Sequence, residues 1–198
     1  MRRTVQLALF IAAAVIAVVG VTLGVPALHP SPDGRAADLT ATSPAPGTEA
    51  SATLPVGRPT RVVVPSIGVD ERLTGVGLEP DGAMTMPDYG SAAWYAEGPR
   101  PGDPGAAVLV AHVRGPAGPD VFAELATLRP GDQVTVLGSR GRATFVVVTV
   151  ETVAKDALPY DRIWPDSTEP LLRLITCGGE PFPQGGFPDN TIVYARLA

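Results

Sequence analysis

The 198-residue sequence contains one cysteine, Cys177, and two histidines, His29 and His112. A lone cysteine cannot form an internal disulfide and cannot hold a structural zinc ion by itself. The sequence also lacks H-E-x-x-H, G-x-S-x-G, G-x-G-x-x-G and P-loop motifs, and its acidic residues form no metal-ligand pattern. We therefore expect neither a metal ion nor an organic cofactor.

Lysine is nearly absent as well, because Lys155 is the only lysine among the 15 basic residues. Acidic residues number 20, which gives a formal net charge of −5. No basic stripe with interleaved aromatic residues accompanies this charge, so the sequence argues against a nucleic-acid-binding protein.

The first 28 residues have the pattern of a membrane signal anchor. Met1, Arg2 and Arg3 precede an apolar run from Val5 to Leu28 that contains no charged residue. Such a run can cross a bilayer, and the arginines before it place the amino terminus in the cytoplasm. The alternatives are a cleaved signal peptide, although the run is long and lacks a clean A-x-A site, or a buried core helix. Either export route places the following residues outside the cell.

Residues 29–57 are rich in Pro, Ala, Ser and Thr and contain almost no large apolar residues. Such a segment cannot bury enough apolar surface to offset the entropy of ordering, so we interpret it as a disordered or partly extended linker. His29 belongs to this linker and is expected to be inert. Residues 58–198 remain, which is enough for one domain with an ordinary core.

Short β-rich runs separated by Gly and Pro clusters dominate this domain and favour a mostly-β barrel or sandwich. We predict strands at 61–64, 107–113, 133–137, 142–153, 171–177 and 191–197, with a hairpin loop at 138–141. One helix is predicted at 120–128, where Asp120 could cap the first turn and Val121, Leu125 and Leu128 share a face.

Within residues 58–198, Cys177 and His112 form the one possible cysteine–histidine pair. Each follows an apolar strand-like run, and Gly178 and Gly179 leave unbulky backbone beside the sulfur. An imidazole can favour the nucleophilic thiolate and later protonate a leaving amine. The alternatives are a buried structural thiol and a hydrogen-bonded structural histidine. Three aspartates beside Gly or Pro are interpreted as turn or capping residues: Asp103, Asp120 and Asp132.

The residues L-I-T-C-G-G at 174–179 and the strand ending in Ala111-His112 resemble sortases, particularly the class F-like group of actinobacteria. Further segments resemble that family in the same order: 65–69, 81–84 followed by Pro87, 94–95, 101–105, 130–132 and 189–190. The resemblance covers about residues 58–198. The histidine precedes the cysteine, unlike in papain-like peptidases, and the two lie farther apart than in L,D-transpeptidases.

The resemblance implies an eight-stranded sortase-type β-barrel with one or two short helices. It implies that Cys177 attacks the Thr carbonyl of an L-P-x-T-G-like sorting motif to form a thioester. His112 would protonate the departing amine and then act as base for an acceptor amine on a cell-wall precursor. The expected enzyme is a single-pass membrane protein with an extracellular catalytic domain, and no cofactor is implied.

One departure from the family concerns a third residue, an arginine that sortases carry about a dozen positions after the cysteine. This sequence has no arginine between Cys177 and Arg196, and Pro188 stands about where one is expected. At about 3.3 Å per residue, Arg196 and Arg173 are too far along their strands. Arg114 is the predicted substitute, for oxyanion stabilisation or substrate positioning, and otherwise a solvated loop residue.

Three functions follow from these patterns. The first is an active sortase, and the second is a catalytically weak or inactive sortase-shaped protein that binds peptides at the cell envelope. The third is a hydrolytic cysteine peptidase, which would cleave without forming an amine-dependent product.

Overall fold

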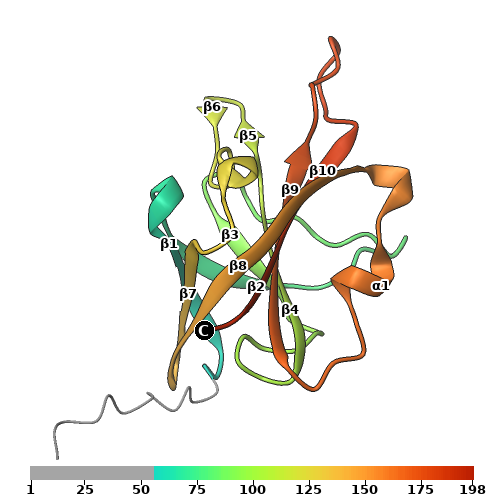
Figure 1. The fold of residues 1–198 in the computed structure, drawn as a ribbon. Helices are drawn as coiled ribbons and strands as arrows, with labels where there is room; N and C mark the ends of the chain where they lie inside the picture. Colours follow the sequence, from blue (N-terminus) through green and yellow to red (C-terminus); the bar gives the residue numbers. More distant parts are fainter. Residues whose placement is uncertain (1–55) are drawn as a thin grey trace, which may run out of the picture. The chain divides into compact units, whose positions relative to one another are not determined.

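The computed structural model describes residues 56–198, and eight of its strands close into a barrel in the order β1-β2-β3-β4-β9-β10-β8-β7 (Figure 1). The barrel strands are β1 (Pro59–Val64), β2 (Val69–Val76), β3 (Ala92–Tyr95), β4 (Gly105–Ala111), β7 (Gln133–Gly138), β8 (Gly141–Ala154), β9 (Pro170–Gly178) and β10 (Asp189–Leu197). The other elements are the β5–β6 ribbon (Arg114–Gly115 and Gly118–Pro119), the 3-10 helices η1 (Pro65–Ile67), η2 (Leu125–Thr127) and η3 (Lys155–Ala157), and α1 (Tyr160–Ile163). The expected eight-stranded, mostly-β barrel is confirmed.

The six strands predicted from the sequence correspond to β1, β4, β7, β8, β9 and β10, and the hairpin loop joins β7 to β8 as expected. Two of the eight barrel strands were not predicted, nor was the short β5–β6 ribbon. β2 carries charged residues and a glycine, and β3 is only four residues long, so neither gives a strong apolar pattern.

The helix predicted at 120–128 is wrong, because only the 3-10 turn η2 forms there. The backbone of this segment instead bonds to the two residues that follow β4. Asp120 N donates to Val113 O, and Phe122 N donates to His112 O. The Asp120 carboxylate accepts from Gly90 N and Val121 N, so it joins two loops rather than capping a helix. Its apolar residues are still buried, with Leu125, Leu128 and Phe122 in the core.

Strands β4 and β9 are apolar on both faces because each face packs against something. Leu109 and Leu174 point into the barrel core, whereas their neighbours Val110 and Ile175 belong to a second apolar cluster that includes Ile163 of α1. Alternation along a strand sends successive side chains to opposite faces, so Cys177 shares the outer face with Ile175. Cys177 therefore lies on the outer surface of the barrel, next to this second apolar cluster.

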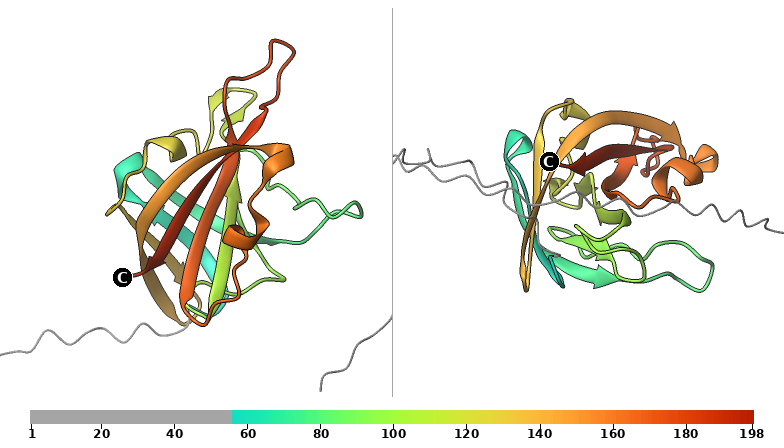
Figure 2. Two further views of the ribbon diagram at one scale, coloured as in Figure 1. Left: turned by 45° about the vertical axis from the view of Figure 1, so that its right-hand side comes forward. Right: turned by 60° about the horizontal axis from the view of Figure 1, so that its bottom comes forward.

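Figures 1 and 2 show the β9–β10 loop and the β5–β6 ribbon projecting from the same end of the barrel. Val56 is fully buried in the core, so the folded domain includes it. The predicted membrane anchor at 5–28 and the linker up to residue 55 lie outside the described residues. Within 56–198 no helix is long and apolar enough to cross a bilayer.

Candidate active site

Two neighbouring parallel strands carry the predicted nucleophile and the predicted acid/base. β4 and β9 pair in register from Gly105 and Pro170 to Val110 and Ile175. Continuing this register by two residues sets His112 level with Cys177. Thr176 Oγ1 donates a 2.8 Å hydrogen bond to Ala111 O, which joins the residues just before each of them.

Two contacts from the segment before β3 orient the His112 ring. Its Nε2 lies 2.9 Å from Pro87 O, and the ring of Tyr89 lies over it with a centroid separation of 4.4 Å. A carbonyl oxygen only accepts, so Nε2 carries the hydrogen in this contact and Nδ1 is the nitrogen that can take up a proton. Asp120 holds the same segment through Gly90 N, at 2.9 Å.

Cys177 and His112 line one cavity of about 400 Å³. Arg114 and Lys155 also line it, so the described residues bring two cations to the cysteine–histidine pair. Cys177 is half-buried and therefore reachable from this cavity.

A second, larger cavity of about 720 Å³ also has Cys177 in its wall, and we call it the apolar groove. Its floor comes from the outer face of the barrel and its sides from the β2–β3 connection and the η3–α1 region. Apolar side chains dominate its lining: Leu78, Met84, Met86, Tyr95, Val110, Leu158, Tyr160, Ile163, Trp164 and Ile175. Four of these are large and exposed in the free protein: Leu78, Met86, Tyr160 and Trp164. The groove can accept an extended apolar segment that ends at the sulfur.

Steric constraints favour glycine at both positions that follow the cysteine. A Cβ on Gly178 would come within 2.5 Å of Thr191 Oγ1, and Gly179 has a φ of 79° with Asp189 close by. The backbone that follows Cys177 can therefore turn tightly into the β9–β10 loop.

Asn190, not Pro188, stands opposite the cysteine on β10, since Asn190 and Cys177 are direct cross-strand partners. Asn190 also lines the apolar groove. Pro188, where the sequence likeness places the family's arginine, directly precedes β10. This strand begins at Asp189, two residues earlier than the strand predicted at 191–197.

The arginines differ in how they are engaged. Arg173 is 5% exposed, donates to Arg162 O and Leu172 O, and lies over the Tyr194 ring at 4.8 Å. Burial lowers the pKa of Arg173. Its guanidinium is held within the fold, away from the sulfur. Arg114 is exposed on β5 and lines the cavity of His112 and Cys177.

Lys155 is the site residue that the sequence analysis missed. It follows β8 directly and lines both the cavity of His112 and the apolar groove. Its signal in the sequence is that it is the only lysine of the chain.

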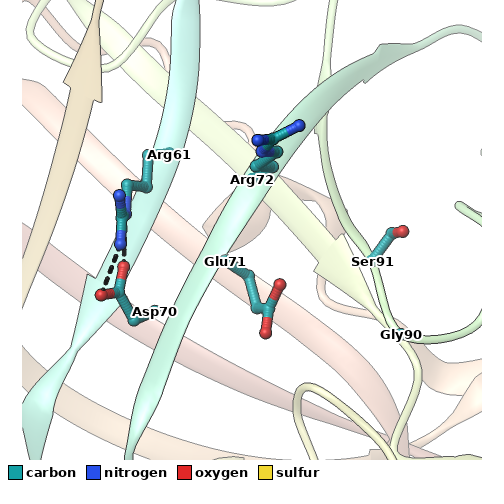
Figure 3. Close-up of a pocket in the computed structure, with 6 residues that line it drawn as sticks. All are labelled: Arg61, Asp70, Glu71, Arg72, Gly90 and Ser91. Carbon is teal, nitrogen blue, oxygen red and sulfur yellow. Dashed lines mark hydrogen bonds and ion pairs between the residues drawn. The ribbon is translucent and has the colours of Figure 1, made fainter.

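A separate recess lies beside β1 and β2, where Arg61 and Asp70 face each other as an ion pair (Figure 3). The hydrogen bond from Arg61 lowers the pKa of Asp70. This pair balances its own charge, and the recess contains neither the cysteine nor the histidine. In the described part of the chain, no three His, Cys, Asp or Glu residues gather as metal ligands.

Comparison with known families decides the identity of this barrel. The family profile described as "Sortase domain" matches residues 62–198. The chain belongs to the sortase family. A comparison with curated proteins finds no match.

Solved sortase structures share the fold of this sortase. Sortase C2 of Group B Streptococcus Pilus Island 1 is 20% identical, with a TM-score of 0.54 and coverage of 70% of this chain and 73% of that one. Sortase C-1 from Actinomyces oris has the same identity and coverage with a TM-score of 0.55. Sortase A from Listeria monocytogenes is 16% identical, with a TM-score of 0.53 and coverage of 70% and 86%.

Membership of the family makes this sortase a cysteine transpeptidase, with Cys177 as the only cysteine it contains. At 16% to 20% identity, the structural likenesses concern the barrel and not the substrate.

Proposed function

We propose that this sortase cleaves an L-P-x-T-G-like sorting motif through a thioester on Cys177 and transfers the acyl group to a cell-wall amine. The observation that carries the proposal is that Cys177 lies in the walls of two cavities, one with His112 and one apolar. A peptide threaded through both would present its scissile bond at the sulfur. The sequence likeness further supports a class F-like sortase.

In the first step, Cys177 Sγ bonds to the carbonyl carbon of the Thr residue in the motif. The carbon–nitrogen bond to Gly then breaks, and His112 protonates the departing amine. In the second step, an acceptor amine attacks the thioester, His112 takes the proton of that amine, and Sγ leaves as thiolate. Water can take the place of the amine, in which case the product is a hydrolysed peptide.

Arg114 is proposed to position the substrate on the leaving-group side. It is exposed and lines the cavity of His112, and it does not line the apolar groove. A cation there can hold carbonyl oxygens of the residues that follow the scissile bond.

We further propose that residues 5–28 anchor the enzyme in the cell membrane with the catalytic domain outside. The absence of charge from Val5 to Leu28 and the arginines before it support this orientation. An anchor would keep the enzyme near membrane-bound substrates and raise their effective concentration.

One observation favours a second function, a sortase-shaped protein that binds envelope peptides without turnover. Asn190 stands opposite Cys177 and supplies an amide instead of a charged group. Incubation of the protein with an L-P-x-T-G peptide and an amine separates the two functions. Transpeptidation requires a ligated product whose amount depends on the amine, whereas a binding protein leaves the peptide intact.

A further inference from the structure

The reaction needs a positive partner for the charge that develops on the substrate. When a sulfur attacks a peptide carbonyl, the carbonyl electron pair moves to oxygen and an oxyanion forms. Preorganised donors at that oxygen are commonly the largest single contribution to catalysis. The donor must lie where the acyl half and the leaving half of the substrate meet, because the oxyanion forms at their junction.

Two residues mark this junction, since Cys177 and Lys155 are the ones that line both the cavity of His112 and the apolar groove. The other polar residues around the sulfur line one cavity each: Arg114 the former and Asn190 the latter. In the described part of the chain, Lys155 is therefore the cation that lines both cavities.

The strand pairing explains how Lys155 reaches this place. β10 lies between β9 and β8, and Asn190 pairs with Cys177 on one side and with Val153 on the other. Directly paired residues share a face of a sheet, as do alternate residues along one strand. Lys155 is two residues beyond Val153, and its N–H donates to Pro188 O at 3.1 Å, which keeps it beside β10.

Arg114 lines only the cavity of His112, and two further cations are engaged within the fold. Arg173, on the same strand as the cysteine, bonds to main-chain carbonyls and lies over Tyr194. Arg162 pairs with Glu151 at 2.8 Å. Lys155 has an exposed ammonium on a flexible four-carbon stem, which suits a donor that must follow a moving oxygen.

We propose that the Lys155 ammonium stabilises the oxyanion formed when Cys177 attacks the substrate carbonyl. This inference rests on the proposed transpeptidase function. The oxygen carries the negative charge while the sulfur–carbon bond forms, and Lys155 donates to it. The electron pair returns to the carbonyl when the carbon–nitrogen bond breaks, and the proton for the leaving amine comes from His112.

The test compares Lys155→Met, Lys155→Arg and a matched control in the full chain in detergent. The control is Arg142→Met, which removes one exposed positive charge at the far end of β8. Mass spectrometry follows the rate of thioester formation in single turnover with an L-P-x-T-G peptide. Alkylation of Cys177 by iodoacetamide measures thiol reactivity alone, and circular dichroism checks the fold.

We expect Lys155→Met to slow acylation by about 10² to 10³, the usual effect of removing one oxyanion donor. Alkylation should change far less than acylation, Lys155→Arg should regain part of the rate, and Arg142→Met should acylate normally. Wild-type acylation rates in Lys155→Met would overturn the proposal. Equal losses of acylation and alkylation would also overturn it, because Lys155 would then act on the sulfur or on the fold. A wild-type protein that forms no thioester would instead overturn the transpeptidase function on which the inference rests.

Discussion

Cys177 and Asn190 are direct partners on adjacent strands, so a neutral amide stands opposite the nucleophile. This pairing leaves the positive charges of the site to residues from other elements, Arg114 of β5 and Lys155 of η3. The proposed catalytic centre thus combines two paired strands, β9 with Cys177 and β4 with His112 just after its end, and charged residues from β5 and η3. The predictions below test each part.

The first prediction concerns the proposed general acid/base, His112. Replacement by Gln should lower thioester formation and ligation by about 10² to 10⁴, the range for loss of a general acid/base. His29→Gln is the matched control, since we expect this linker histidine to be inert. The rates are measured by chromatography of peptide products. Activity of His112→Gln within a few-fold of wild type would contradict the assignment.

Asp120 should act through His112, because its carboxylate holds Gly90 N beside the segment that contacts the imidazole ring. Asp120→Ala frees that segment, and we expect kcat to fall by about tenfold, as misplacement of a catalytic group by small distances is costly. The pH–rate profile of the variant should also change. Asp132→Ala, at another turn carboxylate that accepts a backbone N–H, is the control and should leave the profile unaltered.

Arg114→Ala should raise KM by about fivefold with kcat nearly unchanged, because an exposed charged contact is worth about 1 kcal/mol. Steady-state kinetics over a range of peptide concentrations measure both constants. Near-normal values of both would show that Arg114 is a solvated loop residue.

Trp164 lies in the wall of the apolar groove and is 37% exposed, so a bound peptide can cover it. Trp164→Ala should raise KM by about tenfold, since loss of an aromatic anchor costs more than about 1 kcal/mol. Val148→Ala removes an exposed apolar side chain on β8 that does not line the groove, and it should leave KM unchanged. An equal effect of both variants would contradict the role of the groove.

Tyr194 should make the fold sensitive to alkali. Burial and its hydrogen bond to Glu151 raise the pKa of Tyr194 above its ordinary value. The unfolded chain loses this proton near pH 10, whereas the folded protein keeps it, so the free energy of unfolding should fall as pH rises above about 10. The decline due to this group is at most about 1.4 kcal/mol per pH unit.

Urea unfolding at several pH values measures this effect. Tyr194→Phe should flatten the decline above pH 10, and Tyr160→Phe, at an exposed position, should not. The same slope in wild type and Tyr194→Phe would contradict the explanation.

Much of the fold was predictable because the six predicted strands are largely apolar runs, most of them with Gly or Pro at one end. β2 and β3 escaped prediction, since charged residues in one and the shortness of the other hide the pattern. The 120–128 segment was predicted wrongly for another reason. Its apolar spacing suits a helix, but its Asp120 and Phe122 N–H groups bond to Val113 O and His112 O. Such partners outside the segment cannot be predicted from the spacing of its apolar residues.

The residues of the candidate site also include some that the sequence predicts and some that it does not. Cys177 and His112 could be predicted because each is unique within the domain and follows a strand. Lys155 could not, since it comes to line the same cavities as Cys177 only through the pairing of β8, β10 and β9. The place of Asn190 also depends on cross-strand register, which the sequence alone does not provide.

The most direct test is mass spectrometry of the full chain in detergent, incubated with an L-P-x-T-G-type peptide library with and without an added amine. We predict an acyl thioester on Cys177, a ligated product that requires the amine, and neither in Cys177→Ala. Intact peptides and unmodified Cys177 in correctly folded protein would contradict the account and favour a peptide-binding function.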